Sequence, residues 1–409
     1  MRLVKIKDIG TVVSGSTPKT NVPEYWGGEI AWATPKDLSL LDGQYLYDTA
    51  KKITQLGYDS CSTSLLPKDS VLFSSRAPIG LVAINKIPVC TNQGFKSIIP
   101  NKEVSSLYLY YALKYFSKTL ERLGNGATFK ELSKKTFEEF ALPLPDISDQ
   151  IRIADILSKA ELLIRQRNES LRLLDEFLKS TFLEMFGDPV RNETDRNTKP
   201  LGERIRVKHG FAFQSKYFSS SGKYVLLTPG NFREEGGYRD RGDKQKFYIG
   251  EIPKKYVLKK GDLLVAMTEQ APGLLGSPII IPESNKFLHN QRLGLLEFDR
   301  KYFNTHFLFY LFNTLSIRRI IHAKATGTKV RHTSPKKLEE IAIQYPPLES
   351  QNDFAAIVQK VQALKASNET SLSMLESLFK SLSSKAFKGQ LDLKVESGKA
   401  ESKGVHLYS

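Results

Sequence analysis

Hydrophobic residues recur at alternating steps of four and three along two stretches of this chain, residues 151–185 and 352–388. That alternation places one apolar row along a helix and is typical of a coiled-coil seam. Arg167 and Asn368 interrupt the two rows at matching positions, either to fix the register or because an ordinary turn tilts toward solvent. The sequence therefore predicts two long helices whose seams contain Ile153, Leu157, Ala160, Ile164, Leu171, Leu174 and Leu178, and Phe354, Val358, Val361, Leu364, Leu375 and Phe379.

Upstream of each long helix the pattern changes to short apolar runs bounded by Gly, Pro and Asp. Such runs are typical of buried strands. A helix or two is expected in each half, around residues 106–123 and 303–322. The segment 186–200 is polar and contains two prolines, as linkers do, and the polar, Lys- and Ser-rich residues after Gln390 are expected to be mobile.

The two halves of the chain are diverged copies of each other. GATFKELSKKTFEEFALPLP begins at Gly126, and GTKVRHTSPKKLEEIAIQYP begins 201 residues later, at Gly327. The same offset relates Gln150 to Gln351, at the start of each long helix. Further upstream ATPKDL matches LTPGNF, and TNQGF matches HNQRL, with slightly smaller offsets. Because solenoid repeats have periods of about 20–50 residues, a period near 200 indicates two whole domains of one architecture.

This organisation predicts an α+β chain with two similar β-rich domains carrying peripheral helices, joined by two long helices that form an antiparallel coiled coil. The expected boundaries are 1–145 for the first domain, 146–186 for the central helix, 187–200 for the linker, 201–346 for the second domain, 347–390 for the C-terminal helix and 391–409 for the tail.

Charge adds a partner to this picture. The 409 residues include 60 Lys and Arg against 44 Asp and Glu, for a net charge of +16. Such an excess favours a polyanionic partner, most often nucleic acid, over a protein with merely basic faces. With two cysteines, no apolar leader and no long apolar run, the sequence predicts a cytoplasmic protein without a disulfide framework.

Catalytic motifs are difficult to find. GTVVSGST, residues 10–17, nearly spells a phosphate-binding loop, but Ser16 stands in the lysine position and the second copy lacks the first glycine and the hydroxyl residue. The six histidines form no metal-binding motif, and the Glu-x-Lys at Glu401 lies in the polar tail. We therefore expect no catalytic residue, no metal and no cofactor in this chain.

Polar side chains that flank the apolar strands are the candidates for reading DNA. Arg and Lys pair with guanine edges and Asn and Gln with adenine edges, whereas basic residues near the helices meet phosphates. Individually, an Asn or Gln in a turn more often caps the backbone. The candidates are Thr17, Lys19, Lys36, Arg76, Asn92, Gln93, Lys96 and Lys130 in the first copy, and Gln214, Lys216, Asn231, Gln270, Asn290, Gln291, Arg292, Lys324, Lys329 and Arg331 in the second.

Taken together, the motifs SGSTPKT, EYWGGEIAWATPKDL, FSSRAPIGLVAI, TNQGF and YPPLESQNDFAAIV resemble the DNA-specificity subunit of type I restriction–modification systems. The resemblance covers essentially the whole chain, although the second copy lacks the STP and YWGG elements. It implies a subunit that takes part in defence against foreign DNA. This subunit would lack catalysis, read one half of a split, asymmetric site with each domain and use the helices to set the gap.

The same resemblance implies the partners. Two copies of an adenine-methylating subunit would bind S-adenosylmethionine, and a motor-endonuclease subunit would use ATP and Mg to cut unmodified DNA. Two alternatives remain open from the residues: a self-sufficient enzyme that modifies or cleaves DNA, and a coiled-coil scaffold that binds DNA without sequence preference.

Overall fold

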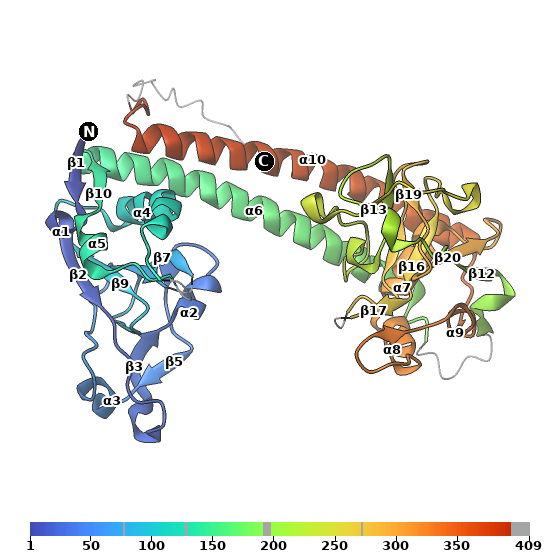
Figure 1. The fold of residues 1–409 in the computed structure, drawn as a ribbon, viewed down its shortest axis with the longest axis horizontal. Helices are drawn as coiled ribbons and strands as arrows, with labels where there is room; N and C mark the ends of the chain where they lie inside the picture. Colours follow the sequence, from blue (N-terminus) through green and yellow to red (C-terminus); the bar gives the residue numbers. More distant parts are fainter. Residues whose placement is uncertain (77, 127–129, 191–197, 271–272, 394–409) are drawn as a thin grey trace, which may run out of the picture. The chain divides into compact units, whose positions relative to one another are not determined.

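A computed structural model of the chain describes residues 1–76, 78–126, 130–190, 198–270 and 273–393 (Figure 1). Residue contacts divide it into two compact units: unit 1 consists of Met1–Asn168 and Thr370–Ser409, and unit 2 of Glu169–Glu369. Each unit therefore contains one β-rich region and part of both long helices, α6 (Ile147–Phe186) and α10 (Leu348–Phe387).

Unit 1 is built on a five-stranded sheet with the order β2-β9-β6-β7-β4, beside a three-stranded sheet β5-β3-β8 and the pair β1-β10. The strands are β1 (Arg2–Lys5), β2 (Gly10–Ser14), β3 (Trp26–Ala33), β4 (Tyr45–Leu46), β5 (Lys51–Ile53), β6 (Val71–Ser75), β7 (Ile79–Asn85), β8 (Cys90–Thr91), β9 (Lys96–Pro100) and β10 (Ala141–Leu144). The helices are α1 (Ile6–Ile9), α2 (Pro35–Ser39), α3 (Gln55–Asp59), α4 (Ser106–Arg122) and α5 (Lys134–Glu139), with a 3-10 turn η1 (Pro23–Tyr25).

Unit 2 repeats this plan with the sheets β12-β20-β16-β18, β13-β15-β14-β19 and β11-β22, plus the short pair β17-β21. Its strands are β11 (Lys199–Pro200), β12 (Ile205–His209), β13 (Phe218–Ser219), β14 (Tyr224–Leu226), β15 (Phe247–Tyr248), β16 (Leu263–Ala266), β17 (Thr268–Glu269), β18 (Pro278–Ile280), β19 (Phe287–Leu288), β20 (Leu293–Phe298), β21 (Arg331–His332) and β22 (Ala342–Ile343). Its helices are α7 (Thr305–Asn313), α8 (Leu315–Ala323) and α9 (Pro335–Glu339), with 3-10 turns η2 (Leu201–Glu203), η3 (Ser215–Tyr217), η4 (Pro229–Asn231), η5 (Gly242–Lys244) and η6 (Lys254–Tyr256).

The strand orders confirm the repeat that the sequence predicts. The run β2-β9-β6-β7 corresponds strand for strand to β12-β20-β16-β18, and β3 pairs in parallel with β8 as β14 does with β19. One difference lies in the covering helix. Helix α4 is continuous, whereas the matching region of unit 2 breaks at Thr314, whose extended backbone ends α7 and whose hydroxyl caps α8.

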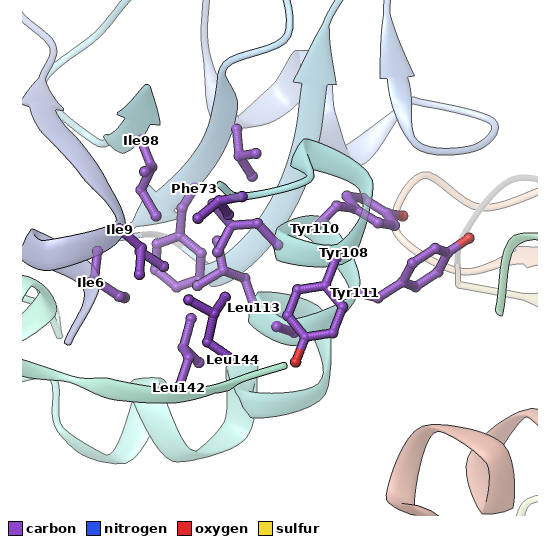
Figure 2. Close-up of a cluster of buried hydrophobic side chains, with 14 of the residues drawn as sticks. Ile6, Ile9, Phe73, Ile98, Tyr108, Tyr110, Tyr111, Leu113, Leu142 and Leu144 are labelled. Atoms are coloured by element: carbon purple, nitrogen blue, oxygen red, sulfur yellow. The ribbon is translucent and has the colours of Figure 1, made fainter. Parts of the chain in front are cut away.

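The core of unit 1 lies between the five-stranded sheet, α4 and the long helices (Figure 2). Phe73 stacks on Phe137 with ring centroids 4.8 Å apart, and the hydroxyl of Tyr108 donates to the carbonyl of Pro143 at 2.6 Å. Ile153 from the start of α6 and Phe387 from the end of α10 are buried in the same cluster. The helices are thus held by the β-rich region and do not depend on helix propensity alone.

The two long helices run antiparallel where they pack together in unit 2. Asp175 of α6 forms an ion pair with Lys365 of α10 at 2.5 Å, and the Phe182 ring lies 5.4 Å from that of Phe354. Contacts therefore move backward along α10 as they move forward along α6.

Most predicted seam residues are buried or half-buried: Ile153, Leu157, Ala160, Ile164, Leu171, Leu174, Leu178, Phe354, Val358, Val361, Leu375 and Phe379.

Leu364 is a correction to the predicted seam, because its side chain is 56% exposed. From Val358 to Val361 and from Val361 to Leu364 the spacing is three residues each time. Two successive steps of three, without a step of four between them, turn the second side chain away from the apolar row. A step of four instead selects Lys365, whose side chain is 24% exposed and ends on Asp175. A lysine is compatible with this position because its aliphatic stem covers apolar surface while its ammonium group stays paired.

Candidate nucleic-acid interface

Each unit carries the same tight turn at the end of its main sheet, at residues 92–94 in unit 1 and 290–292 in unit 2. The side-chain oxygen of Asn92 accepts from the amide of Gly94 at 2.9 Å, and that of Asn290 accepts from the amide of Arg292 at 3.1 Å. The turn is tied to the strand before it, because Ser75 donates its amide to Gly94 at 2.7 Å and Met267 donates its amide to Arg292 at 3.0 Å.

The loop containing SGSTPKT packs against this turn and forms no nucleotide cradle. The amide of Ser16 donates to the carbonyl of Thr91 at 2.9 Å, and in unit 2 Phe211 donates to His289 at 2.9 Å. A side chain on Gly15 would lie 2.1 Å from the carbonyl oxygen of Asn92, so only glycine permits this approach. The glycine therefore allows close packing of two loops, with Thr17 hydrogen-bonded to Gln93 through their side chains.

A second segment closes each site from the other side. Leu132 donates its amide to the carbonyl of Ser75 at 2.9 Å, and Thr333 donates to Met267 at 2.9 Å. As a result, the backbone of Glu131 lies opposite that of Arg76 in a β-bridge. In unit 2 the backbone of His332 lies opposite that of Thr268 in the same way. Three loops distant in sequence thus meet in the same way in both units, which is a geometry able to present several side chains to one ligand.

In unit 1 this meeting point is occupied by an ion-pair network. The carboxylate of Glu131 lies 3.8 Å from the guanidinium of Arg76 and 3.5 Å from the ammonium of Lys96. Lys96 is 8% exposed, which departs from the expectation that it reads DNA at the surface. Its charge is balanced by Glu131, which satisfies the requirement that a buried ammonium group be paired.

In unit 2 the corresponding place is an open cavity of about 470 Å³. His209, Gln291, Arg292 and His332 lie along its wall, together with Phe211. Sequence reasoning missed His209 and His332, since it tested the histidines only as metal ligands. The signal was present in the repeat, because the offset of 201 aligns His332 with Glu131.

Beneath the unit 2 turn lies His289, which is 2% exposed and hydrogen-bonded through Nε2 to the carbonyl of Leu293 at 2.9 Å. Burial disfavours the charged imidazolium and lowers the pKa of His289 to about 4. The ring is therefore neutral at pH 7, with Nε2 donating. It closes the turn from inside and so positions Gln291 and Arg292.

We expect unit 2 to lose stability as the pH falls from 6.5 to 4. Over that range the unfolded chain protonates His289 and the folded chain does not, which favours unfolding by at most about 3 kcal/mol. His289→Thr, which copies Thr91 of unit 1, should flatten this slope while lowering stability at pH 7. Urea unfolding followed by circular dichroism at pH 4.5 and 7 measures both. A residual slope is expected from His306, whose pKa burial also lowers. Equal slopes in wild type and variant would contradict the assignment.

The structure brings together only some of the candidate DNA-reading residues. Thr17, Arg76, Asn92 and Gln93 gather at the unit 1 turn, and Asn290, Gln291 and Arg292 form the unit 2 turn. The remaining candidates are exposed on surrounding loops, on helix ends or on the short strand β21: Lys19, Lys36, Lys130, Gln214, Lys216, Gln270, Lys324, Lys329 and Arg331.

Two further candidates are corrected by their burial. Asn231 is 1% exposed: its side chain accepts from the amide of Thr228 at 3.0 Å and donates to Gln245 at 3.0 Å. It completes a capping box, as Asp37 does with Thr34 in unit 1. Asn290 is 9% exposed, and its side-chain oxygen accepts the hydrogen bond from the amide of Arg292 within the turn. Both are structural residues, because short amide side chains often satisfy nearby backbone groups.

Other kinds of site are not found in the described part of the chain. No three or more His, Cys, Asp or Glu side chains gather there in a way that could hold a metal ion. Among the same residues, no helix combines the length and apolar character needed to span a bilayer.

Comparison with known proteins decides the family. The sequence profile described as "Type I restriction modification DNA specificity domain" matches residues 1–173 and again residues 193–377. The chain belongs to this family. It is thus a type I restriction–modification specificity subunit with two specificity domains, one in each half of the sequence.

Individual relatives agree with this assignment. The specificity subunit is 30% identical over 420 residues to the type I restriction enzyme MjaIX specificity subunit of Methanocaldococcus jannaschii, covering 95% of this chain and 92% of that protein. It is also 30% identical over 172 residues to the EcoR124I/EcoR124II specificity subunit of Escherichia coli, covering 40% and 42%.

Solved structures show that the fold of this specificity subunit is shared. A type I restriction–modification chain, solved in a study of complex assembly and conformational transition, aligns over 95% of this chain and 98% of its own length, with a TM-score of 0.58 and 18% identity. The S subunit from M. genitalium aligns over 96% of both chains, with a TM-score of 0.55 and 15% identity.

Proposed function

We propose that this specificity subunit reads a bipartite, asymmetric DNA site, with the turn 92–94 and its surroundings serving one half-site and the turn 290–292 serving the other. The observation that carries this proposal is the common backbone frame of the two turns combined with their different side chains. An identical frame suits the same task in both units, and different side chains suit different bases.

The chain would act without catalysis of its own. Arg76 and Lys96 at the unit 1 turn are both paired with Glu131, and among the described residues no threonine hydroxyl of the unit 2 cavity is hydrogen-bonded to a histidine. Methyl transfer would reside in two copies of a methylating subunit that binds S-adenosylmethionine. Translocation and cleavage would reside in a motor-endonuclease subunit that uses ATP and Mg. Double-stranded DNA is the substrate that all three subunits share.

A selection of bound sequences from random duplexes, made with the methylating partner present, tests the proposal. We expect a two-part motif with a fixed gap and two different halves. The purified chain alone should transfer no label from S-adenosylmethionine to DNA, and methylation by the chain alone would favour a self-sufficient enzyme. A steep salt dependence without any enriched motif would instead favour the scaffold, because counterion release alone is indifferent to sequence.

A further inference from the structure

The two units place different side chains at equivalent points of their common frame. Glu131 in unit 1 is replaced by His332 in unit 2, as the matching β-bridges to Arg76 and Thr268 show. The arginine also changes place: the turn position held by Gly94 in unit 1 is held by Arg292 in unit 2. Unit 1 thus neutralises its arginine with a carboxylate, whereas unit 2 presents an arginine from the turn itself.

In the part of the chain that the structure describes, no carboxylate neutralises Arg292. Its side chain is exposed, and within the described ranges no acidic residue forms an ion pair with it. The nearby Glu269 is 3% exposed, and one of its oxygens accepts from the amides of Gly273, Leu274 and Leu275 at 2.9–3.1 Å. Its other oxygen lies 3.3 Å from His322. The carboxylate of Glu269 therefore interacts with the loop that follows it and with His322, and it does not pair with Arg292. The guanidinium of Arg292 remains able to donate to a ligand.

The lining of the cavity defines the chemistry of that ligand. The guanidinium of Arg292 can only donate hydrogen bonds, whereas Gln291, His209 and His332 can donate as well as accept, and Phe211 supplies apolar surface. Because the guanidinium of Arg292 has donors and no acceptor, it favours a group that presents two neighbouring acceptors. The apolar surface favours a flat base over a phosphate, which has no apolar face. In the major groove guanine presents O6 and N7, both acceptors, whereas adenine presents a donor beside its acceptor.

We propose that the unit 2 cavity receives the major-groove edge of a guanine in the second half-site, with the guanidinium of Arg292 donating to O6 and N7. This inference rests on the proposed function, since it names the base that one of the two turns reads. Unit 1 does not share this preference through the same position, because Gly94 has no side chain and Arg76 is paired with Glu131.

Selections from random duplexes with the methylating partner test this assignment. In Arg292→Ala we expect one guanine position in one half-site to relax, with about ten- to hundredfold less discrimination, while the other half stays unchanged. His332→Glu, which transplants the carboxylate of unit 1, should relax the same position by pairing with Arg292. Arg319→Ala is the matched control, because Arg319 is an exposed arginine of the same unit outside the cavity.

The outcomes separate this inference from the proposed function. If wild type selects no two-part motif, the proposed function fails and the guanine assignment fails with it. If wild type selects two halves and Arg292→Ala leaves both unchanged, the assignment is overturned while the proposed function stands. The assignment is equally overturned if Arg292→Ala weakens all sequences uniformly, since that is the behaviour of a phosphate contact.

Discussion

Deleting one heptad from each long helix, residues 164–170 and 368–374, is expected to shorten the gap in the DNA motif and leave both halves unchanged. Both deletions lie where the helices pass from one unit to the other. Seven residues span about 10 Å of helix at roughly 1.5 Å per residue, the length of about three base pairs. A whole heptad is required because it returns the apolar row to the same side of the helix.

Binding selections with the methylating partner measure this effect directly. Affinity should also fall, because DNA turns through about a third of a helical repeat over three base pairs and has to twist to meet both units. The control removes a heptad from α6 only, which leaves the two seams unequal in length and should destabilise the chain. A paired deletion that changed the selected bases but kept the gap would disprove the idea that the helices set the spacing.

The repeat is the part of the structure that could be predicted most fully from sequence. Its matches lie at positions where the backbone itself imposes a requirement. Gly15 and Gly210 permit loops to touch, and Thr34 and Thr228 open equivalent capping boxes. Requirements of this kind survive divergence of the surrounding residues, so a few matched letters predict the architecture of two whole domains.

The reading surface could be predicted only in part, because a polar residue has the same letter whether it faces solvent or the interior. Asn231 and Asn290 are such cases: both flank strands as a DNA-reading residue would, yet their oxygens are bonded to the local backbone. The cavity in unit 2 was missed for a different reason. At the position of Glu131 the second copy has His332, which becomes noticeable only when the two copies are compared residue by residue, because no motif within the second copy marks the cavity.

The seam error has a similar origin. Leu364 is more apolar than its neighbour Lys365, so a rule based on hydrophobicity selects it, whereas helix geometry selects the residue one step later. The partner in the other helix supplies the missing information. The carboxylate of Asp175 in α6 pairs with the ammonium group of Lys365. The residue pattern within α10 alone cannot predict a partner that lies in the other helix.

Replacing Gln150 or Gln351 with alanine is expected to destabilise one unit selectively by about 2–4 kcal/mol. Each glutamine is fully buried at the start of a long helix and forms three hydrogen bonds to backbone groups. Gln351 accepts from the amide of Asn304 at 2.9 Å and donates to the carbonyls of Tyr302 and Pro346 at 3.0 and 2.9 Å. Gln150 makes the same three bonds to Ser105, Glu103 and Pro145. Truncation removes all three, and at a net value of about 0.5–1.5 kcal/mol for each hydrogen bond the loss is about 2–4 kcal/mol.

The two tryptophans make the selectivity measurable, because Trp26 and Trp32 both lie in unit 1. Gln150→Ala should lower the urea midpoint seen by tryptophan fluorescence, and Gln351→Ala should lower a transition that circular dichroism detects and fluorescence does not. Asn352→Ala is the control, since its bond to Asn304 is exposed and should be worth under about 1 kcal/mol. Gln351→Glu keeps the shape of the side chain but replaces its two donors with a carboxylate oxygen. It should therefore be as damaging as alanine at pH 7. A Glu variant as stable as wild type would show that the glutamine fills space and that its hydrogen bonds contribute little.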